Sequence, residues 1–408
     1  MVLILLSATS GVSTEQSPSV NAASANGSQT KPKLSPTPNA STIPKTSGVS
    51  TAKNPGPSKS PMATLRAQVK SNRVGIATGD TLPWLSSGQL NAELNDFQSL
   101  GVGWVRLDID WSDIQPNGPD RYDWSNLDNV VKAANARGLK LLPTIAYTAP
   151  WARLPECASS EFCQPQDPHQ FATFAAAAVA RYAPLGVHDW EVWNEENTVK
   201  FWQPSPNITA YVQLLQATYP LIKQADPAST VILGGLAPTS APDGIDELDF
   251  LSGVYKAGAR TYFDAVGVHP YSFPVPASYF VAWSAWSQMS ATTPSIRSIM
   301  SSNGDGDKQV WATEYGAPTN GPGAIATETN YNLDQNPDHV DEAFQAYIAA
   351  DAVNTAETYP WMGPLFWYSY KDLGTNTDAA DNFYGLLRAD GSRKPAYYSF
   401  QQAVSATH

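Results

Sequence analysis

Residues 104–109 read Trp-Val-Arg-Leu-Asp-Ile, and residues 140–145 read Lys-Leu-Leu-Pro-Thr-Ile. Each run has the length and apolar content of a buried strand in a parallel sheet. Between the two runs lies a helix-like stretch, residues 127–137, which ends at the helix-stop signal Gly138. The segment therefore predicts a strand, a helix and a second strand that runs parallel to the first.

The same alternation of strand and helix continues along the rest of the chain. Six further apolar runs are candidate strands, at residues 74–77, 190–193, 231–234, 265–268, 310–313 and 365–368. Helix-like stretches occupy the gaps, at residues 89–100, 171–182, 211–224, 248–257, 295–301 and 340–358. Eight such repeats predict an α/β fold of the (β/α)8 TIM-barrel type. A doubly wound open sheet competes with this prediction, but it has fewer strands and a Gly-rich loop that is missing after residue 77.

The first 72 residues differ in composition from the rest of the chain. From about Ser10 to Asn72 they are Ser, Thr, Pro, Ala, Asn, Gly and Lys with almost no large apolar side chains. Such a segment cannot bury enough apolar area to offset the entropy of ordering it. We therefore expect a disordered Ser/Thr/Pro-rich segment over residues 1–72 and a barrel domain over residues 73–408.

The extreme N-terminus bears on localisation. Residues 1–6 are apolar, but the run is short and has no basic residue before it, so it would be an atypical or truncated signal peptide. It is also too short to span a membrane as a helix, and no other segment resembles a membrane span. We expect a secreted or cell-surface protein without membrane insertion.

Composition and charge narrow the class of partner. The chain has 408 residues and a net charge of -12, which disfavours nucleic acid and anionic membranes. It contains 13 Trp and 18 Tyr, more than a barrel core usually needs, and flat rings stack well on sugar faces. The five His show no metal-ligand spacing. We expect a carbohydrate substrate, no metal, no cofactor and a monomer.

The two cysteines, Cys157 and Cys163, lie in a Pro-, Ser- and Glu-containing stretch that reads as a loop. A disulfide between them would fit an oxidising compartment. Two free thiols are the alternative.

Two glutamates stand at the ends of predicted strands on opposite sides of the barrel. Catalytic side chains of TIM barrels lie at the C-terminal ends of the strands. Glu195 follows the fourth predicted strand and Glu314 follows the seventh. Alone, either could be a solvated loop residue. Together they match the pair that a retaining glycosidase needs, a general acid and a nucleophile.

The residues around both glutamates resemble a known group. Residues 190–197, Trp-Glu-Val-Trp-Asn-Glu-Glu-Asn, resemble the acid/base motif of glycoside hydrolase clan A, and residues 311–316, Trp-Ala-Thr-Glu-Tyr-Gly, resemble its nucleophile motif. Residues 268–271 and Val105-Arg106 followed by Trp111 fit the same pattern. The similarity is greatest to families 39 and 5 and runs from about Val74 to the C-terminus. It implies a retaining glycoside hydrolase that cleaves a β-glycosidic bond in an oligo- or polysaccharide.

One residue departs from that pattern. Glu196 stands where such motifs commonly have Pro, so two carboxylates are adjacent. The acid of the clan directly follows Asn, which selects Glu195. Because side chains alternate along an extended strand end, we expect Glu196 to point away from Glu195.

Further roles follow from chemistry together with the resemblance. Asn194 is expected to bind the sugar 2-hydroxyl and Trp367 to form the floor under the sugar. Arg106 and Tyr271 are expected to stabilise charge on Glu314, with His269 on the same wall. Arg106 could instead be a structural ion-pair partner and His269 an ordinary core histidine.

Other aromatic and acidic residues near strand ends are less specific. Candidate outer stacking surfaces, each of which could equally be ordinary packing, are Tyr147, Trp151, Trp202, Trp283 and Trp286. Glu191 lies within its strand, which indicates a structural role. One of Asp108 and Asp110 should point to the barrel interior, but the sequence does not say which.

Two other functions remain open at this stage. The same two glutamates could transfer a glycosyl group to a sugar instead of to water, and sequence does not separate these reactions. A catalytically inactive barrel could instead bind wall polysaccharide, although retention of both Glu195 and Glu314 argues against it.

Overall fold

The structure, a computed structural model, describes residues 72–407. The predicted N-terminal segment lies outside the described residues except for Asn72, so its boundary with the barrel domain stays a prediction. Within the described part, no helix is both long enough and apolar enough to cross a membrane.

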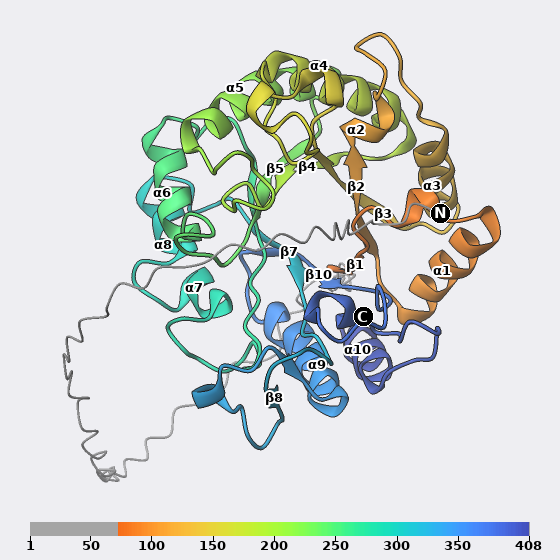
Figure 1. The fold of residues 1–408 in the computed structure, drawn as a ribbon, viewed down its shortest axis with the longest axis vertical. Coiled ribbons are helices and arrows are strands. Elements are labelled where there is room, and N and C mark those ends of the chain that lie inside the picture. The colour runs from red at the N-terminus through yellow and green to blue at the C-terminus, as the bar shows by residue number, and fades with distance from the viewer. Residues whose placement is uncertain (1–71, 408) are drawn as a thin grey trace, which may run out of the picture. The chain divides into compact units, whose positions relative to one another are not determined.

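Eight parallel strands close into a barrel, as predicted (Figure 1). Around the barrel the order is β1, β10, β7, β6, β5, β4, β3 and β2, so every strand pairs with its neighbour in the repeat. The strands are β1 (Val74–Ala77), β2 (Trp104–Asp110), β3 (Lys140–Ala146), β4 (Asp189–Asn194), β5 (Thr230–Leu236), β6 (Ala265–Val268), β7 (Val310–Tyr315) and β10 (Met362–Tyr368). Two of the predicted ranges match the observed strands, and the other six fall short by one to three residues at their ends.

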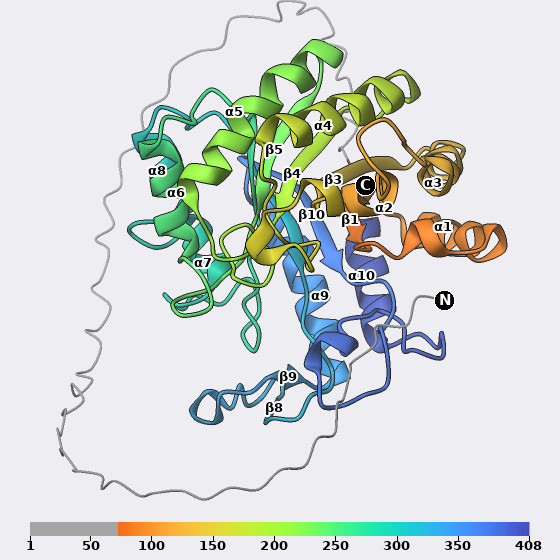
Figure 2. The same ribbon diagram turned by 45° about the horizontal axis from the view of Figure 1, so that its top comes forward.

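Helices surround the barrel (Figures 1 and 2). They are α1 (Ser87–Leu100), α3 (Ser125–Asn135), α4 (Pro168–Tyr182), α5 (Ile208–Ala225), α6 (Glu247–Lys256), α8 (Ile296–Ser302), α9 (Glu342–Glu357) and α10 (Pro395–Ala406). The sequence prediction missed α10, which starts with Pro395 at a position where proline is favoured. It also missed two short helices in loops, α2 (Trp111–Ile114) and α7 (Ala285–Ser290).

The apolar core has two layers, one on each face of the strands. The smaller layer fills the inside of the barrel and consists of Ala77, Trp104, Leu142, Ile232, Ala265, Trp311 and Phe366. The larger layer lies between the strands and the helices. Because side chains alternate along a strand, each strand supplies both layers. Polar side chains on the inner face lie further along the strands, at the end where the catalytic residues of such barrels are found.

Two loops add structure at that end of the barrel. The loop after β3 contains a disulfide between Cys157 and Cys163, whose Cα atoms are 5.4 Å apart, which confirms the predicted bond. After β7 the chain forms a small two-stranded sheet from β8 (Ile325–Ala326) and β9 (His339–Val340). Sequence periodicity gave no indication of these two-residue strands.

Candidate active site

The backbone bends sharply where β4 ends, and this bend presents Glu195. Trp193 has φ +75° and Glu195 has φ +51°, in the left-handed region that non-glycine residues rarely adopt. The Trp193 ring is fully buried against Tyr147 and Trp202, and its Nε1 donates to the Phe201 carbonyl at 2.8 Å. Packing thus holds an unfavourable backbone shape, as is common at functional sites.

Asn197 ties this bend to the next strand. Its Nδ2 donates to the carbonyls of Ala237 and Ile245 at 2.8 and 2.9 Å, and its Oδ1 accepts from the Ala237 amide at 3.0 Å. The side chain is fully buried, so three hydrogen bonds connect the loop after β4 to the loop after β5. Asn197 belonged to the quoted motif, but the sequence did not indicate this role.

Arg106 joins three strand ends inside the barrel. Its Nε, Nη1 and Nη2 contact Glu191, Glu314 and Asn194 respectively, each at 2.6 Å. Arg106 is 1% exposed and Glu191 is fully buried, with a further hydrogen bond from Thr144 to Glu191 at 2.8 Å. Arg106 therefore pairs with Glu191 in the barrel interior and also contacts Glu314.

Glu314 and Glu195 lie on either side of His269. The Tyr271 hydroxyl donates to Oε2 of Glu314 at 2.9 Å. Nδ1 of His269 is 2.8 Å from Oε1 of Glu195 and 3.6 Å from Oε2 of Glu314. One oxygen from each carboxylate and one ring nitrogen of His269 all lie within 4.8 Å of one another. The fold thus brings together Glu195 and Glu314, which lie more than 100 positions apart in the sequence.

The electrostatic environment favours an ionised Glu314. Burial acts to raise its pKa, but charge on His269, charge on Arg106 and the hydrogen bond from Tyr271 outweigh burial and lower it. Burial acts to lower the pKa of His269, whereas Glu314 and the hydrogen bond with Glu195 raise it above 6.5. The imidazole between the two carboxylates is therefore stabilised in its charged form.

A glycine makes room for the imidazole. A Cβ atom at Gly235 would lie 2.1 Å from Nε2 of His269, so a larger residue at that position would displace the ring. Gly235 pairs with Asn194 across β4 and β5, directly beside Glu195.

Glu196 points away from Glu195, as expected, but for an additional reason. The alternation argument assumed extended backbone, whereas Glu195 is left-handed. Glu196 is fully buried beside Tyr211, and burial raises its pKa to about 8. A neutral, enclosed carboxylic acid of this kind cannot reach a substrate.

The structure corrects the prediction for Trp367. Its ring is 1% exposed and packs on the helix side of β10 against Tyr315 and Phe400. The next residue, Tyr368, packs against the inner layer of the barrel. Its pKa is raised by burial and then by the nearby charge of Glu314. The inner face at the end of this strand therefore belongs to Tyr368, because the predicted register assigned the wrong side of the strand to the mouth.

The candidate stacking residues divide into two groups. Trp202 and Trp286 are 1% and 2% exposed and pack in the core, so they cannot stack on a sugar. Tyr147 is nearly buried beside Trp193, and its pKa is raised by burial and by Asp108 and Asp110. Trp151 is partly buried, with Nε1 bonded to the Gln115 carbonyl at 2.7 Å. Trp283 is 52% exposed and lines a surface pocket with Phe273 and Leu333.

Within residues 72–407, Glu195, His269 and Glu314 are also the only set of three or more His, Cys or acidic residues whose ligand atoms lie close enough together to share a metal ion. Nδ1 of His269 is already engaged with Glu195, and both oxygens of Glu314 accept hydrogen bonds from Arg106 and Tyr271. A metal ligand of the usual kind would have these atoms free. The donor set is therefore that of a hydrogen-bonded carboxylate pair, and the absence of a metal requirement stays a prediction.

The barrel and its carboxylate pair define a class, the glycoside hydrolases of clan A. The family model described as cellulase (glycosyl hydrolase family 5) matches residues 66–353 of the chain. The chain therefore belongs to glycosyl hydrolase family 5. No curated protein sequence matches it.

Solved structures share the fold at low sequence identity. A family 39 glycoside hydrolase from Bacteroides cellulosilyticus WH2 is 22% identical with a TM-score of 0.62, covering 82% of this chain and 63% of its own. The GH39 enzyme from Xanthomonas axonopodis pv. citri is 19% identical with a TM-score of 0.57, covering 81% and 65%. GH5_18 from Streptomyces cattleya, in complex with GlcNAc, is 18% identical with a TM-score of 0.61, covering 83% and 81%. The chain thus spans slightly less than two thirds of the two family 39 chains.

Proposed function

We propose that the protein is a retaining glycoside hydrolase that cleaves a β-glycosidic bond in an oligo- or polysaccharide. Retaining enzymes hold their two carboxyl groups about 5–5.5 Å apart, whereas inverting enzymes leave room for a water. The observation that carries the proposal is the approach of Glu195 and Glu314, with one oxygen of each inside a 4.8 Å cluster.

The surroundings of the two carboxylates support a division of roles between them. Glu314, with its lowered pKa and two hydrogen bonds, is the nucleophile that attacks the anomeric carbon. Glu195 is the acid that protonates the leaving oxygen and later activates water. Because His269 occupies Oε1 of Glu195, we assign the proton transfer to Oε2. Arg106 holds the amide oxygen of Asn194, which leaves the amide nitrogen to bind the sugar 2-hydroxyl.

The remaining expectations follow from the same proposal. Tyr368 replaces Trp367 as the residue under the bound sugar. The disulfide between Cys157 and Cys163 fits an oxidising compartment, so we propose that the enzyme acts outside the cytoplasm. The monomeric state stays a prediction from the sequence. Transfer to a sugar acceptor stays an alternative, because it would use the same two glutamates.

The test is a screen of nitrophenyl glycosides and polysaccharides with wild type beside Glu314→Gln. Wild type should release reducing sugar from at least one substrate. The variant should lose more than the ~10²–10⁴-fold that a general acid contributes, because it lacks the nucleophile. Treatment with EDTA serves as the control and should leave the wild-type rate unchanged. Equal rates in wild type and Glu314→Gln, or no turnover of any substrate, would overturn the proposal.

A further inference from the structure

Residues 147–167 connect β3 to α4, and we call this segment the disulfide loop. Two short 3₁₀ turns are its longest regular elements. A connection of this length without a helix or strand of its own is uncommon and usually has a functional role. The bond between Cys157 and Cys163 joins two residues of the same loop, with a sequence separation of 6. It therefore constrains the shape of the loop rather than the arrangement of the barrel strands.

A short backbone ladder connects the disulfide loop to residues 198–203, which follow the acid. The Gln203 amide donates to the Phe162 carbonyl at 2.9 Å, and the Gln164 amide donates to the Gln203 carbonyl at 3.0 Å. Cys163 lies between these two hydrogen bonds and is fully buried. One half of the disulfide thus belongs to the ladder, so the shape of the disulfide loop acts directly on Gln203.

The same segment holds the backbone of Glu195. The amide and the hydroxyl of Thr198 both donate to the Glu195 carbonyl at 2.9 Å. Thr198 is held in turn, because its carbonyl accepts from the Trp202 amide at 3.0 Å and its hydroxyl oxygen accepts from the Phe201 amide at 3.3 Å. Since Gln203 follows Trp202 directly, hydrogen bonds and one peptide bond connect the ladder to Glu195.

Aromatic packing makes a second connection from the disulfide loop to the bend at the end of β4. The Phe162 ring meets the rings of Phe201 and Tyr147 edge to face, with centroids 5.1 and 4.9 Å apart. Tyr147 contacts the ring of Trp193 at 5.9 Å, and the Phe201 carbonyl accepts from Nε1 of Trp193. Trp193 and Glu195 have left-handed backbone, which persists only where the surroundings enforce it. The disulfide loop is part of those surroundings.

We propose that the disulfide between Cys157 and Cys163 positions Glu195 for proton transfer to the leaving group. The proposal rests on the proposed function, because it concerns the acid of that reaction. The two cysteines are positioning residues, which act through residues 198–203 and the aromatic contacts. A misplacement of about 1 Å can cost 10²-fold in rate, so a looser bend lowers acid catalysis. Glu314 is held by Arg106 and Tyr271 instead, so the nucleophile keeps its contacts.

The test compares two leaving groups on one sugar that wild type cleaves. A dinitrophenyl glycoside needs little protonation of its leaving group, whereas a phenyl glycoside needs much more. Cys157→Ala/Cys163→Ala should lower kcat/KM by about tenfold or more for the phenyl glycoside and by less than about threefold for the dinitrophenyl glycoside. Glu195→Ala sets the scale for complete loss of the acid. A disulfide that only stabilises the fold would lower both values by the same factor, because it changes only the folded fraction.

Two further variants keep the disulfide and change one ring each. Phe162→Leu removes the ring that joins the disulfide loop to Phe201, so it should lower the phenyl rate relative to the dinitrophenyl rate. Tyr331→Leu is the matched control, because its ring is also partly buried in a loop but stacks on Phe344 of α9 at 5.5 Å. This control should leave the ratio of the two rates unchanged.

Hydrogen exchange measured by mass spectrometry gives a readout that needs no turnover. Peptides that cover residues 195–203 should exchange at least about tenfold faster in Cys157→Ala/Cys163→Ala than in wild type, because their amides lose fixed acceptors. Peptides from α9 should exchange at the wild-type rate, which shows that the rest of the barrel is intact.

Two results would overturn the proposal. The first is an equal loss of kcat/KM for both leaving groups in the disulfide variant, and the second is unchanged exchange over residues 195–203. If the disulfide variant does not fold, Phe162→Leu decides by the same two criteria. Failure of the hydrolase proposal would appear separately, as the absence of turnover by wild type, and the exchange measurement then decides whether the disulfide loop holds Glu195.

Discussion

Glu314 and Asp108 both project from the inner face of the barrel near the ends of their strands, yet they experience opposite environments. Glu314 is contacted by Arg106, Tyr271 and His269, and its pKa is lowered despite burial. Arg106 also acts on Asp108, but burial and acidic neighbours outweigh its charge and raise the pKa of Asp108 to about 7, and Oδ1 of Asp108 accepts no hydrogen bond from the described residues. A nearby cation alone therefore does not keep a buried carboxylate ionised. The direct ion pair with Arg106 and the oriented hydrogen bond from Tyr271 are what distinguish Glu314.

The largest expected effect comes from removing that cation. Arg106→Gln removes the guanidinium that pairs with both Glu191 and Glu314, which should cost about 3–5 kcal/mol of unfolding free energy. The rate constant kcat/KM should fall by about 10²-fold or more, because Glu314 loses its ion pair. Denaturant unfolding and steady-state kinetics measure the two effects.

A matched control separates burial from simple loss of charge. Arg181 pairs with Asp128 at the surface, with side chains 42% and 39% exposed. Arg181→Gln should cost less than about 1 kcal/mol and leave kcat/KM unchanged. If Arg106→Gln were as mild as Arg181→Gln, the direct ion pair with Arg106 would not be what distinguishes Glu314 from Asp108.

A smaller change at the mouth should shift the pH profile. Tyr271→Phe removes one hydrogen bond to Glu314, so the pKa of Glu314 rises and less of it is ionised at low pH. Because activity is lost as pH falls through that pKa, the acidic limb of kcat/KM against pH should move to higher pH. Above the limb, kcat/KM should fall by about tenfold. Tyr315→Phe, whose hydroxyl contacts Ser272 instead, should leave the limb in place.

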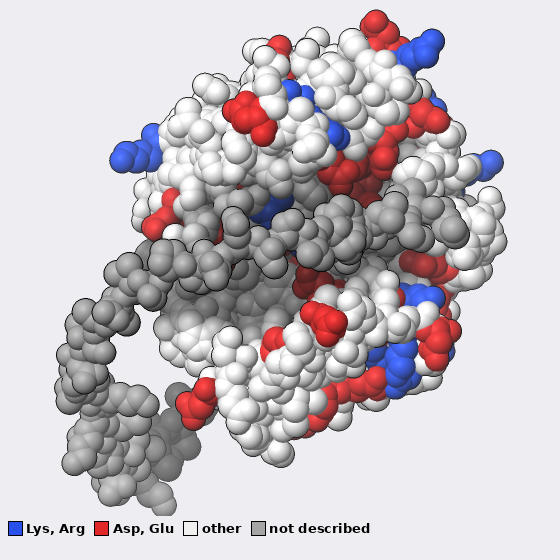
Figure 3. Space-filling view, viewed as in Figure 1, with Lys and Arg blue, Asp and Glu red and all other residues white. Residues whose placement is uncertain are grey.

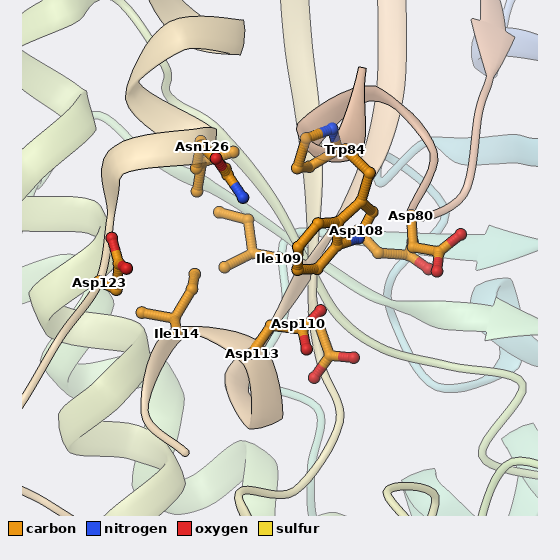
Figure 4. Close-up of a pocket in the computed structure, with 11 residues that line it drawn as sticks. Asp80, Trp84, Asp108, Ile109, Asp110, Asp113, Ile114, Asp123 and Asn126 are labelled. Atoms are coloured by element: carbon orange, nitrogen blue, oxygen red, sulfur yellow. The ribbon is translucent and has the colours of Figure 1, made fainter. Parts of the chain in front are cut away.

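The smallest effect concerns Asp110, which lines a cavity together with four other aspartates (Figure 4), in the region over β2 where Figure 3 shows acidic side chains gathered. The folded-state pKa of Asp110 is about 8, above its ordinary value of 3.8, so its stabilising contribution is present at low pH and is lost as pH rises towards 8. Asp110→Asn keeps an acceptor for the Ser112 amide and cannot ionise. Its Tm at about pH 8 should exceed that of wild type by a few degrees, about 2–4 °C per kcal/mol. A Tm difference that is unchanged between pH 4 and pH 8 would contradict the raised pKa of Asp110.

The sequence predicted the barrel well, and it pointed to Glu195 and Glu314 as a pair that the fold brings together, because both predictions depend on local pattern. Apolar runs and strand ends are visible along the chain, and Glu195 and Glu314 lie in quoted motifs. The side of a strand that a residue faces is harder to predict, because one residue of register reverses it. This is why Trp367 was predicted to lie under the sugar, whereas Tyr368 is the residue on the inner face of the strand.

Other features depend on contacts between distant segments. The hydrogen bonds of Asn197 join two loops that are 40 residues apart, and no sequence periodicity predicts these bonds. One cavity is lined by Asp80 from the loop after β1 and by Asp113 from α2. Asp108 and Asp110 were noted in the sequence, but only the structure shows that both line this cavity. Each aspartate alone would be read as a solvated surface residue, and only the closed barrel brings them together.

The central claim is the division of labour between Glu195 and Glu314, and azide tests it most directly. With an activated aryl glycoside that wild type cleaves, azide should restore turnover of Glu195→Ala and give a glycosyl azide of the same anomeric configuration as the substrate. With Glu314→Ala, azide should attack from the vacated nucleophile side and give the opposite anomer. Nuclear magnetic resonance of the products distinguishes the two. Opposite assignments, or rescue of Glu196→Ala in place of Glu195→Ala, would contradict the account.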